Sequence, residues 1–249
     1  QVVTGYVIAL LVAALLIGPS FHLLQAAPLC ISTAPARAPN VVELYTSEGC
    51  SSCPPADQWL AALPRGESVL ALAFHVDYWD HLGWRDRFAS PAHTARQYAL
   101  QAGSGARFVY TPQVLVNGRD WPGWRHSDTL PGASASAVAL RVVQDGRRFS
   151  AEVGTRQERG PLSGYWALLE DTHRSRASAG ENAGRELRHD HVVRQLSAVE
   201  AWSSDQARTW RWTPPAPEPG HPARVVFVVT DSATARPVQA AQLPLDPGC

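Results

Sequence analysis

The sequence predicts two structural units in succession: an α/β domain over residues 40–132 and a mostly antiparallel, β-sandwich-like domain over residues 133–249. In the first unit, apolar strand-like runs alternate with helix-like segments, whereas short β-rich runs separated by turn residues dominate the second. The 249 residues suffice for one or two domains, and 45% hydrophobic with 18% charged residues is typical of a globular protein.

The N-terminal residues predict export. Val7–Ile17 is continuously apolar and is followed by Gly18 and Pro19. Such a run is typical of a signal peptide, whereas a membrane span needs about 20 apolar residues. We predict a signal peptide over residues 1–26; cleavage after Ala36 and an uncleaved membrane anchor are the alternatives. All three place the remaining chain outside the cytoplasm, in the periplasm or secreted, and cleavage leaves no stable membrane span.

The first unit follows a linker over residues 27–39, which is rich in Pro and Ala. Pro54 opens its first helix and Pro64 ends it. The later run VLALAFHV is apolar enough for a strand buried on both faces. Asn117-Gly118 predicts a hairpin turn after the last strand. The expected order is strand, helix, strand, helix, strand, over residues 41–46, 54–63, 69–76, 91–102 and 112–116.

The second unit consists of short β-rich runs. Asp145-Gly146 predicts a hairpin between the first two, and the Pro-rich residues 213–222 predict a surface loop. Several short strands between turn clusters favour an antiparallel sandwich. The expected strands cover residues 139–143, 149–153, 165–169, 209–212, 225–230 and 238–243.

Cys50 and Cys53 are separated by two residues, after a predicted strand and at the start of a predicted helix. The positive end of the helix dipole and its unpaired N–H groups favour a thiolate there. Such a pair can exchange disulfides through a mixed-disulfide intermediate. We predict that Cys50 is the attacking thiol and Cys53 the resolving thiol. The alternative is a structural disulfide of an exported protein.

The other two cysteines, Cys30 and Cys249, lie at the ends of the predicted mature chain. Domain termini are often close in space, so we predict a structural disulfide between them. Cleavage after Ala36 would remove Cys30 and leave Cys249 without this partner.

The order of these features resembles the thioredoxin superfamily, in which a Thr-Pro or Val-Pro dipeptide with a cis bond abuts the cysteine pair. Thr111-Pro112 stands at the start of the last strand of the first unit. The chain is more closely similar to a secreted bacterial family catalogued as domain of unknown function 1223. The resemblance implies a thioredoxin-like fold for the first unit and a catalytic centre of Cys50, Cys53 and Pro112. The most similar stretches are residues 44–57, 75–80, 83–84, 96–97, 110–113 and 180–185.

The aromatic segment FHVDYWDHLGWRDRF follows the second strand of the first unit. The loops after parallel neighbouring strands lie at one sheet edge, so we expect this segment beside Cys50. Loops carry binding residues disproportionately, and we predict a substrate wall of His75, Asp77 and Trp79, joined by Thr111. One alternative is a packed aromatic loop. Another is a copper or zinc site that uses the cysteine pair with His75 or His81.

Three further features of the sequence lead to expectations about the environment of single residues or short segments. Glu43 lies seven residues before Cys50, one more than the buried acid of thioredoxins, which puts it on the opposite strand face, so we expect an exposed or core-edge side chain. His189 and His191 are expected on a solvated face rather than at a metal site. The segment Gly180–Arg185 is expected to be a tight structural turn.

These patterns favour an exported thiol–disulfide oxidoreductase-like protein that acts on a thiol or disulfide of a protein or small molecule, with no cofactor and no metal. The alternative is a redox-inert or metal-carrying (copper or zinc) periplasmic binding protein. The formal net charge is zero, with 22 basic and 22 acidic residues. Nucleic acid is therefore not expected as a partner, because its binding requires a basic excess.

Overall fold

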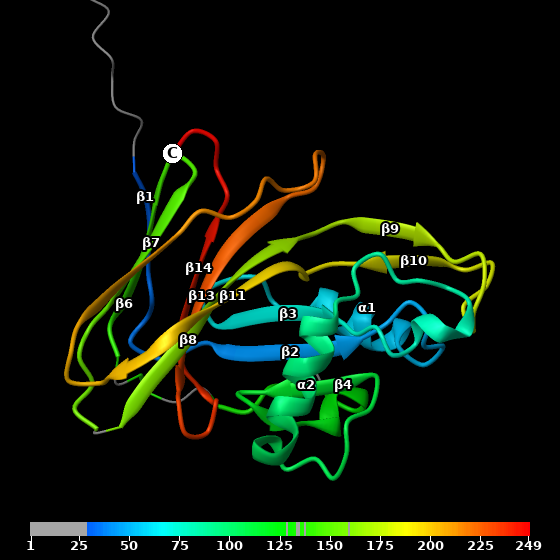
Figure 1. The fold of residues 1–249 in the computed structure, drawn as a ribbon, viewed down its shortest axis with the longest axis horizontal. Helices are drawn as coiled ribbons and strands as arrows, with labels where there is room; N and C mark the ends of the chain where they lie inside the picture. Colours follow the sequence, from blue (N-terminus) through cyan, green and yellow to red (C-terminus); the bar gives the residue numbers. More distant parts are fainter. Residues whose placement is uncertain (1–28, 128, 133–134, 137, 159) are drawn as a thin grey trace, which may run out of the picture.

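The computed structural model describes residues 29–127, 129–132, 135–136, 138–158 and 160–249, and the predicted signal peptide lies outside them. The described residues form fourteen β-strands and only two α-helices (Figure 1). The predicted fold class, an α/β thioredoxin-like domain followed by a β-sandwich-like domain, is therefore wrong. β-structure dominates, and one large sheet contains strands of both predicted units.

The larger sheet has eight strands in the order β14-β13-β8-β11-β3-β2-β4-β5. Its only parallel pairs among the described residues are β2 with β3 and β3 with β11. The latter pairing, at Ala73 and Val192, joins strands from the two sides of residue 132. The boundary at residue 132 stays a prediction, but the sheet crosses it. The strands are β2 (Asn40–Thr46), β3 (Val69–His75), β4 (Gln113–Val116), β5 (Arg119–Asp120), β8 (Pro161–Glu170), β11 (Val192–Ser203), β13 (Ala223–Asp231) and β14 (Pro237–Pro244).

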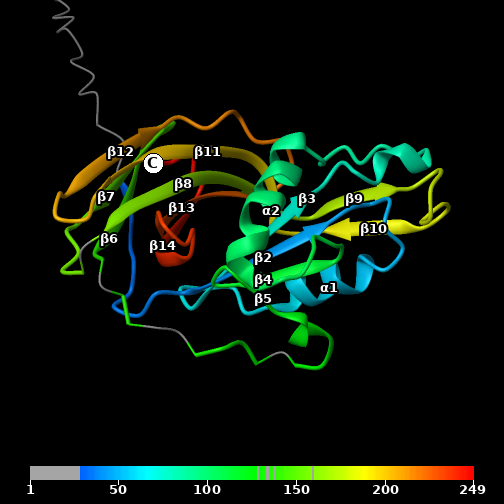
Figure 2. The same ribbon diagram turned by 60° about the horizontal axis from the view of Figure 1, so that its bottom comes forward.

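A second sheet of four strands packs against the β8, β13 and β14 part of the larger sheet (Figure 2). It contains β1 (Cys30–Thr33), β6 (Leu140–Asp145), β7 (Arg148–Val153) and β12 (Arg208–Trp212). Phe149, Trp166 and Phe227 fill the core between the two sheets. The predicted linker thus contains a strand, β1, which pairs with β6. The predicted disulfide is present and attaches β1 to the C-terminus through Cys30 and Cys249.

The two helices cover opposite faces of the β3-β2-β4 part of the larger sheet. Helix α1 (Pro54–Ala62) packs Leu60 against Leu44, whereas α2 (Pro91–Ser104) places Leu100 in the cluster of Tyr45. Two short 3-10 helices, η1 (Asp80–Leu82) and η2 (Pro122–Arg125), lie in the connections. None of the helices in the described residues is long and apolar enough to span a membrane.

The hairpin of β9 (His173–Arg176) and β10 (Glu186–His189) continues β8 and β11 beyond the larger sheet. In Figures 1 and 2 it extends alongside β3 and α1, and β10 contacts α1. A segment from the second half of the chain thereby reaches the edge at which β2 and β3 end.

Candidate functional site

The candidate site lies at one edge of the larger sheet, as the sequence predicts. Thr46 at the end of β2 stands opposite His75 at the end of β3. Cys50 and Cys53 follow β2, precede α1 and form a disulfide with their Cα atoms 5.4 Å apart. Two disulfides in the described residues are typical of a protein from an oxidising compartment.

Trp79 connects the cysteine loop with the start of β4. Its indole N–H donates a hydrogen bond to Thr111 Oγ1 at 2.7 Å. Its Cβ lies 2.9 Å from the position that a Cβ on Gly49 would occupy, so a larger residue there would clash with it. The Thr111–Pro112 peptide bond is cis, as predicted. Trp79 and Thr111, two predicted substrate-binding residues, therefore lie together next to the residue that precedes Cys50.

The tip of the β9–β10 hairpin is hydrogen-bonded to the cysteine loop. Cys50 and Cys53 are both 0% exposed. The side-chain amide of Asn182, also fully buried, donates hydrogen bonds to the carbonyl oxygens of Glu48 at 2.8 Å and Cys50 at 3.0 Å. The carboxylate of Glu181 accepts a hydrogen bond from the backbone N–H of Ser51 at 2.9 Å. The expected tight turn is thus hydrogen-bonded to the loop that carries the disulfide.

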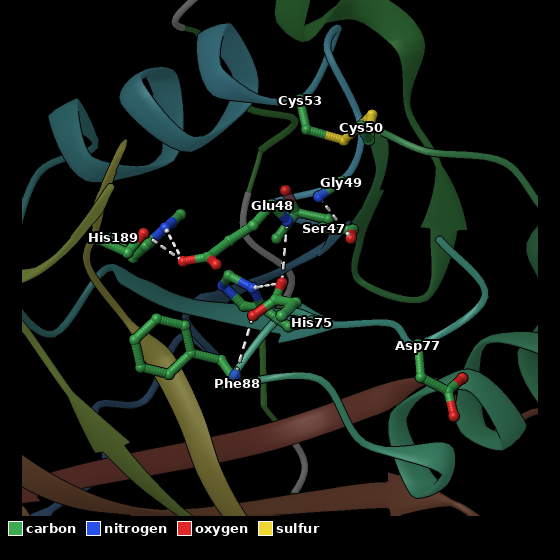
Figure 3. Close-up of polar contacts among 12 residues, drawn as sticks. Ser47, Glu48, Gly49, Cys50, Cys53, His75, Asp77, Phe88 and His189 are labelled. Atoms are coloured by element: carbon green, nitrogen blue, oxygen red, sulfur yellow. Dashed lines mark hydrogen bonds and ion pairs between the residues drawn. A yellow bond between two sulfur atoms is a disulfide. The ribbon is translucent and has the colours of Figure 1, made fainter. Parts of the chain in front are cut away.

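Glu48 is a buried carboxylate below the disulfide (Figure 3). It accepts hydrogen bonds from His189 Nε2 at 3.1 Å, from Trp84 Nε1 at 2.7 Å and from the hydroxyl of Ser175. Burial acts to raise the pKa of Glu48, but these hydrogen bonds outweigh burial and lower it. His189 is therefore a buried partner of Glu48, and the expected solvated face is wrong for it and for the buried His191.

His75 forms a buried pair with Asp86, with 2.6 Å between His75 Nδ1 and Asp86 Oδ2. The same carboxylate accepts hydrogen bonds from the backbone N–H groups of Glu48 and Phe88, each at 2.9 Å. Burial opposes the charge of Asp86, but the charge and hydrogen bond of His75 outweigh it and lower the Asp86 pKa. The His75 ring stands nearly perpendicular to that of His189, with centroids 4.9 Å apart. His75 thus pairs with the carboxylate that holds the backbone of Glu48 in the cysteine loop (Figure 3).

Asp57 is a third buried carboxyl, one helical turn after Cys53. Its backbone N–H donates to the Cys53 carbonyl oxygen at 3.1 Å. Thr46 Oγ1 donates to Asp57 Oδ2 at 3.2 Å, and Asp57 Oδ1 has no hydrogen-bond partner among the described residues. Burial raises the pKa of Asp57 to about 7, although His189 and Thr46 act to lower it. A carboxyl group with this pKa can give or take a proton near neutral pH. Asp57 was not among the predicted site residues, although its place four residues after Cys53 puts it on the same helix face as that cysteine.

Other residues from the sequence analysis lie elsewhere. Asp77 accepts a hydrogen bond from Thr94 Oγ1 and lies apart from the disulfide (Figure 3). Glu43 is 3% exposed, against the expectation, and bonds Arg96 at 2.6 Å and the Tyr165 hydroxyl at 2.9 Å. Strand β2 is covered on both faces, so its side chains are buried whichever face they are on. The roles predicted for His75, Asp77, Trp79 and Thr111 in substrate binding stay predictions.

The alternative copper or zinc site does not assemble in the described part of the chain. Cys50 and Cys53 are joined to each other, so neither offers a thiolate in this form. His81 is exposed and its Nδ1 lies 2.8 Å from the carbonyl oxygen of Tyr78. The clusters of potential metal ligands among the described residues contain none of these side chains.

Residues 41–230 match the sequence profile of a protein family of unknown function, DUF1223. The chain belongs to the DUF1223 family. The matched region runs from β2 into β13 and therefore includes the cysteine pair and the β9–β10 hairpin of this chain. Among curated proteins, none matches the chain.

Two solved structures are similar to this DUF1223 chain. The first is a crystal structure of a structural-genomics target protein from Agrobacterium tumefaciens, with 26% identity and a TM-score of 0.62, covering 84% of this chain and 96% of that one. The second is HBP35 of Porphyromonas gingivalis, with 16% identity and a TM-score of 0.57, covering 86% of this chain and 77% of that one. The second likeness concerns the fold alone.

Proposed function

We propose that this DUF1223 protein is an exported thiol–disulfide oxidoreductase that uses Cys50 and Cys53 on protein or small-molecule thiols, in the periplasm or secreted. One observation carries the proposal: the pair stands at the start of α1 with the buried carboxyl of Asp57 one turn further on. A helix N-terminus stabilises a thiolate. An acid with a pKa of about 7 supplies or accepts the accompanying proton at neutral pH.

In the oxidising direction, a substrate thiolate attacks Cys50 Sγ and forms a mixed disulfide. The bond between the two cysteine sulfurs breaks, and Cys53 leaves as a thiolate that takes a proton from Asp57. A second substrate thiol loses its proton to the regenerated carboxylate or to water and attacks the substrate sulfur of the mixed disulfide. Cys50 then leaves as a thiolate. The substrate loses two electrons and gains a disulfide, and the cysteine pair gains two electrons.

The fully covered disulfide requires one further step, because a thiolate must reach a sulfur atom to attack it. The hairpin tip is held to the cysteine loop by the hydrogen bonds of Asn182 and Glu181. Glu181 is exposed, and the strands of the hairpin belong to a separate two-stranded sheet. We therefore take the described structure as the closed state, from which the hairpin tip must withdraw before exchange.

The same burial favours a second candidate function, a redox-inert binding protein in which Cys50–Cys53 is a structural crosslink. Both cysteines are 0% exposed, as a crosslink in a core would be. The two candidates differ in how easily the disulfide is reduced.

The deciding experiment is the reduction potential of each disulfide, measured by equilibration with glutathione, alkylation and mass spectrometry. The Cys30–Cys249 disulfide serves as a reference within the same molecule. We expect Cys50–Cys53 to titrate above about −300 mV and Cys30–Cys249 below it, as is typical of labile and structural disulfides respectively. If both pairs titrate below that potential, the redox-inert function is the correct one.

A further inference from the structure

A cluster of two histidines and a glutamate lies where the β9–β10 hairpin leaves the larger sheet, apart from the cysteine pair. His173 begins β9, whereas Glu218 and His221 lie in the loop between β12 and β13. One potential ligand atom from each of the three lies within 4.8 Å of the other two. His173 is 1% exposed, and the other two residues are half-buried.

The hydrogen bond made by one ring nitrogen of His173 shows which nitrogen has a lone pair. His173 Nε2 lies 2.8 Å from Glu170 Oε2, and a carboxylate only accepts hydrogen bonds. The proton of the neutral ring is therefore on Nε2, which leaves a lone pair on Nδ1. Nδ1 is buried and has no hydrogen-bond partner among the described residues.

The same reasoning applies to His221. Its Nδ1 lies 3.1 Å from the carbonyl oxygen of Asp171, which can only accept, so the neutral ring has its lone pair on Nε2. This nitrogen faces Glu218 Oε1 at 3.7 Å. Arg87 and Arg194 approach the other oxygen of Glu218, Oε2. In the neutral rings, His173 Nδ1, His221 Nε2 and Glu218 Oε1 are thus electron-pair donors without a hydrogen, in three residues that lie close together, and a cation among them would stabilise this arrangement.

We propose that His173 Nδ1, His221 Nε2 and Glu218 Oε1 bind one divalent transition-metal ion of the zinc class. Two imidazoles and a carboxylate are an established zinc ligand set that leaves a fourth position open. In metal sites the second ring nitrogen of a ligating His typically donates to a carboxylate or a backbone carbonyl, as both rings do here.

The charges around the site and the orientation of the two imidazole rings determine what metal binding requires. The carboxylates of Glu170 and Glu218 balance the guanidinium groups of Arg87 and Arg194, so the ion enters a locally neutral site. The two imidazole rings are nearly parallel, with centroids 3.8 Å apart. Both lone pairs can therefore reach one ion only if the half-buried His221 ring turns. A proton competes with the metal ion for this site: it would bind to His221 Nε2 and be shared with the Glu218 carboxylate in a hydrogen bond.

The test is calorimetric titration of the untagged, oxidised full chain with zinc chloride at pH 7.5 after treatment with a chelator. We expect one zinc per chain, with affinity about tenfold or more weaker in His221→Gln and in Glu218→Gln. His126→Gln, which removes an exposed histidine outside the cluster, should bind as the wild type does. The Cys50→Ser/Cys53→Ser variant should also bind normally, so this result is independent of the proposed redox function.

Both loop variants retain a half-buried polar side chain, and circular dichroism will establish that they fold. Substoichiometric zinc in the wild type, or unchanged affinity in either loop variant, would overturn the site. A proton that stays on His221 Nε2 in the presence of zinc, observed by nitrogen-15 NMR of the imidazole, would identify the proton as the occupant instead.

Discussion

The side-chain amide of Asn182 donates a hydrogen bond to the backbone carbonyl oxygen of Cys50, 132 positions earlier in the sequence. The same amide donates to the carbonyl oxygen of Glu48. One buried side chain on the hairpin tip therefore holds the loop that carries the disulfide. If the hairpin tip must withdraw before disulfide exchange, as we propose, the strength of this contact sets how often the disulfide is accessible.

Asn182→Ala should speed reduction of Cys50–Cys53 by dithiothreitol. The substitution leaves two carbonyl oxygens without their donor, and a buried unpaired polar group costs about 1–3 kcal/mol. Because 1.4 kcal/mol is about a tenfold change in an equilibrium, we expect reduction about tenfold or more faster. Alkylation kinetics followed by mass spectrometry measure this rate.

Asn117→Ala is the matched control for Asn182→Ala. Asn117 also makes side-chain hydrogen bonds, to Asn40 and to the backbone of Val41, but it lies in the β4–β5 turn. It reports the effect of general destabilisation. Equal acceleration in the two variants at equal stability would show that the hairpin tip does not control access.

Asp57→Asn should stabilise the protein in a pH-dependent way. The folded-state pKa of Asp57, about 7, lies above its usual value of 3.8 because of burial. Between these values the folded protein retains a proton that the unfolded chain has released, so wild-type stability falls as pH rises through this window and levels off above about pH 7. The full difference is on the order of 4 kcal/mol.

The measurement is the free energy of unfolding of wild type and Asp57→Asn by urea denaturation from pH 4 to pH 8. Other titrating groups are common to both proteins, so their difference isolates Asp57. The variant should match the wild type near pH 4 and exceed it most above pH 7. A difference that does not change with pH would show that Asp57 has its ordinary pKa in the folded protein.

Cys53→Ser should accumulate mixed disulfides with substrate, whereas Cys50→Ser should accumulate few. Without the resolving thiol, a partner bound to Cys50 cannot be released by intramolecular attack. Non-reducing gel electrophoresis after expression in an oxidising compartment measures the adducts. Equal trapping by both variants, or trapping by neither, would contradict the assignment of Cys50 as the nucleophile.

Removal of the other disulfide, in Cys30→Ser/Cys249→Ser, should destabilise the fold without changing the reactivity of Cys50–Cys53. The bond closes a loop with a sequence separation of 219 and anchors β1 to the C-terminus. Loss of a native disulfide typically costs about 2–5 kcal/mol. Urea denaturation should show this loss, and an unchanged midpoint would mean that the disulfide adds nothing to stability.

Local patterns in the sequence determined much of the secondary structure and the cysteine chemistry. The apolar runs identified β2 and β3, Pro54 and Pro64 bounded α1, and the spacing of Cys50 and Cys53 predicted a pair at a helix start. The parallel neighbours β2 and β3 then placed Thr46 and His75 at one edge. These features depend on residues close in sequence, or on adjacent strands, for which periodicity and turn chemistry are sufficient.

The tertiary structure alone decided the fold class and the surroundings of the disulfide. The burial pattern of strand β11 is irregular and mostly half-buried or exposed, so no strict alternation predicted this strand. Its pairings with β8 and β3 nevertheless merge the two predicted units into one sheet. Asn182 and His189 meet Glu48 only through that merger. Contacts between residues more than a hundred positions apart depend on which strands pair, and strand pairing is set by the packing of the whole core rather than by any local sequence period.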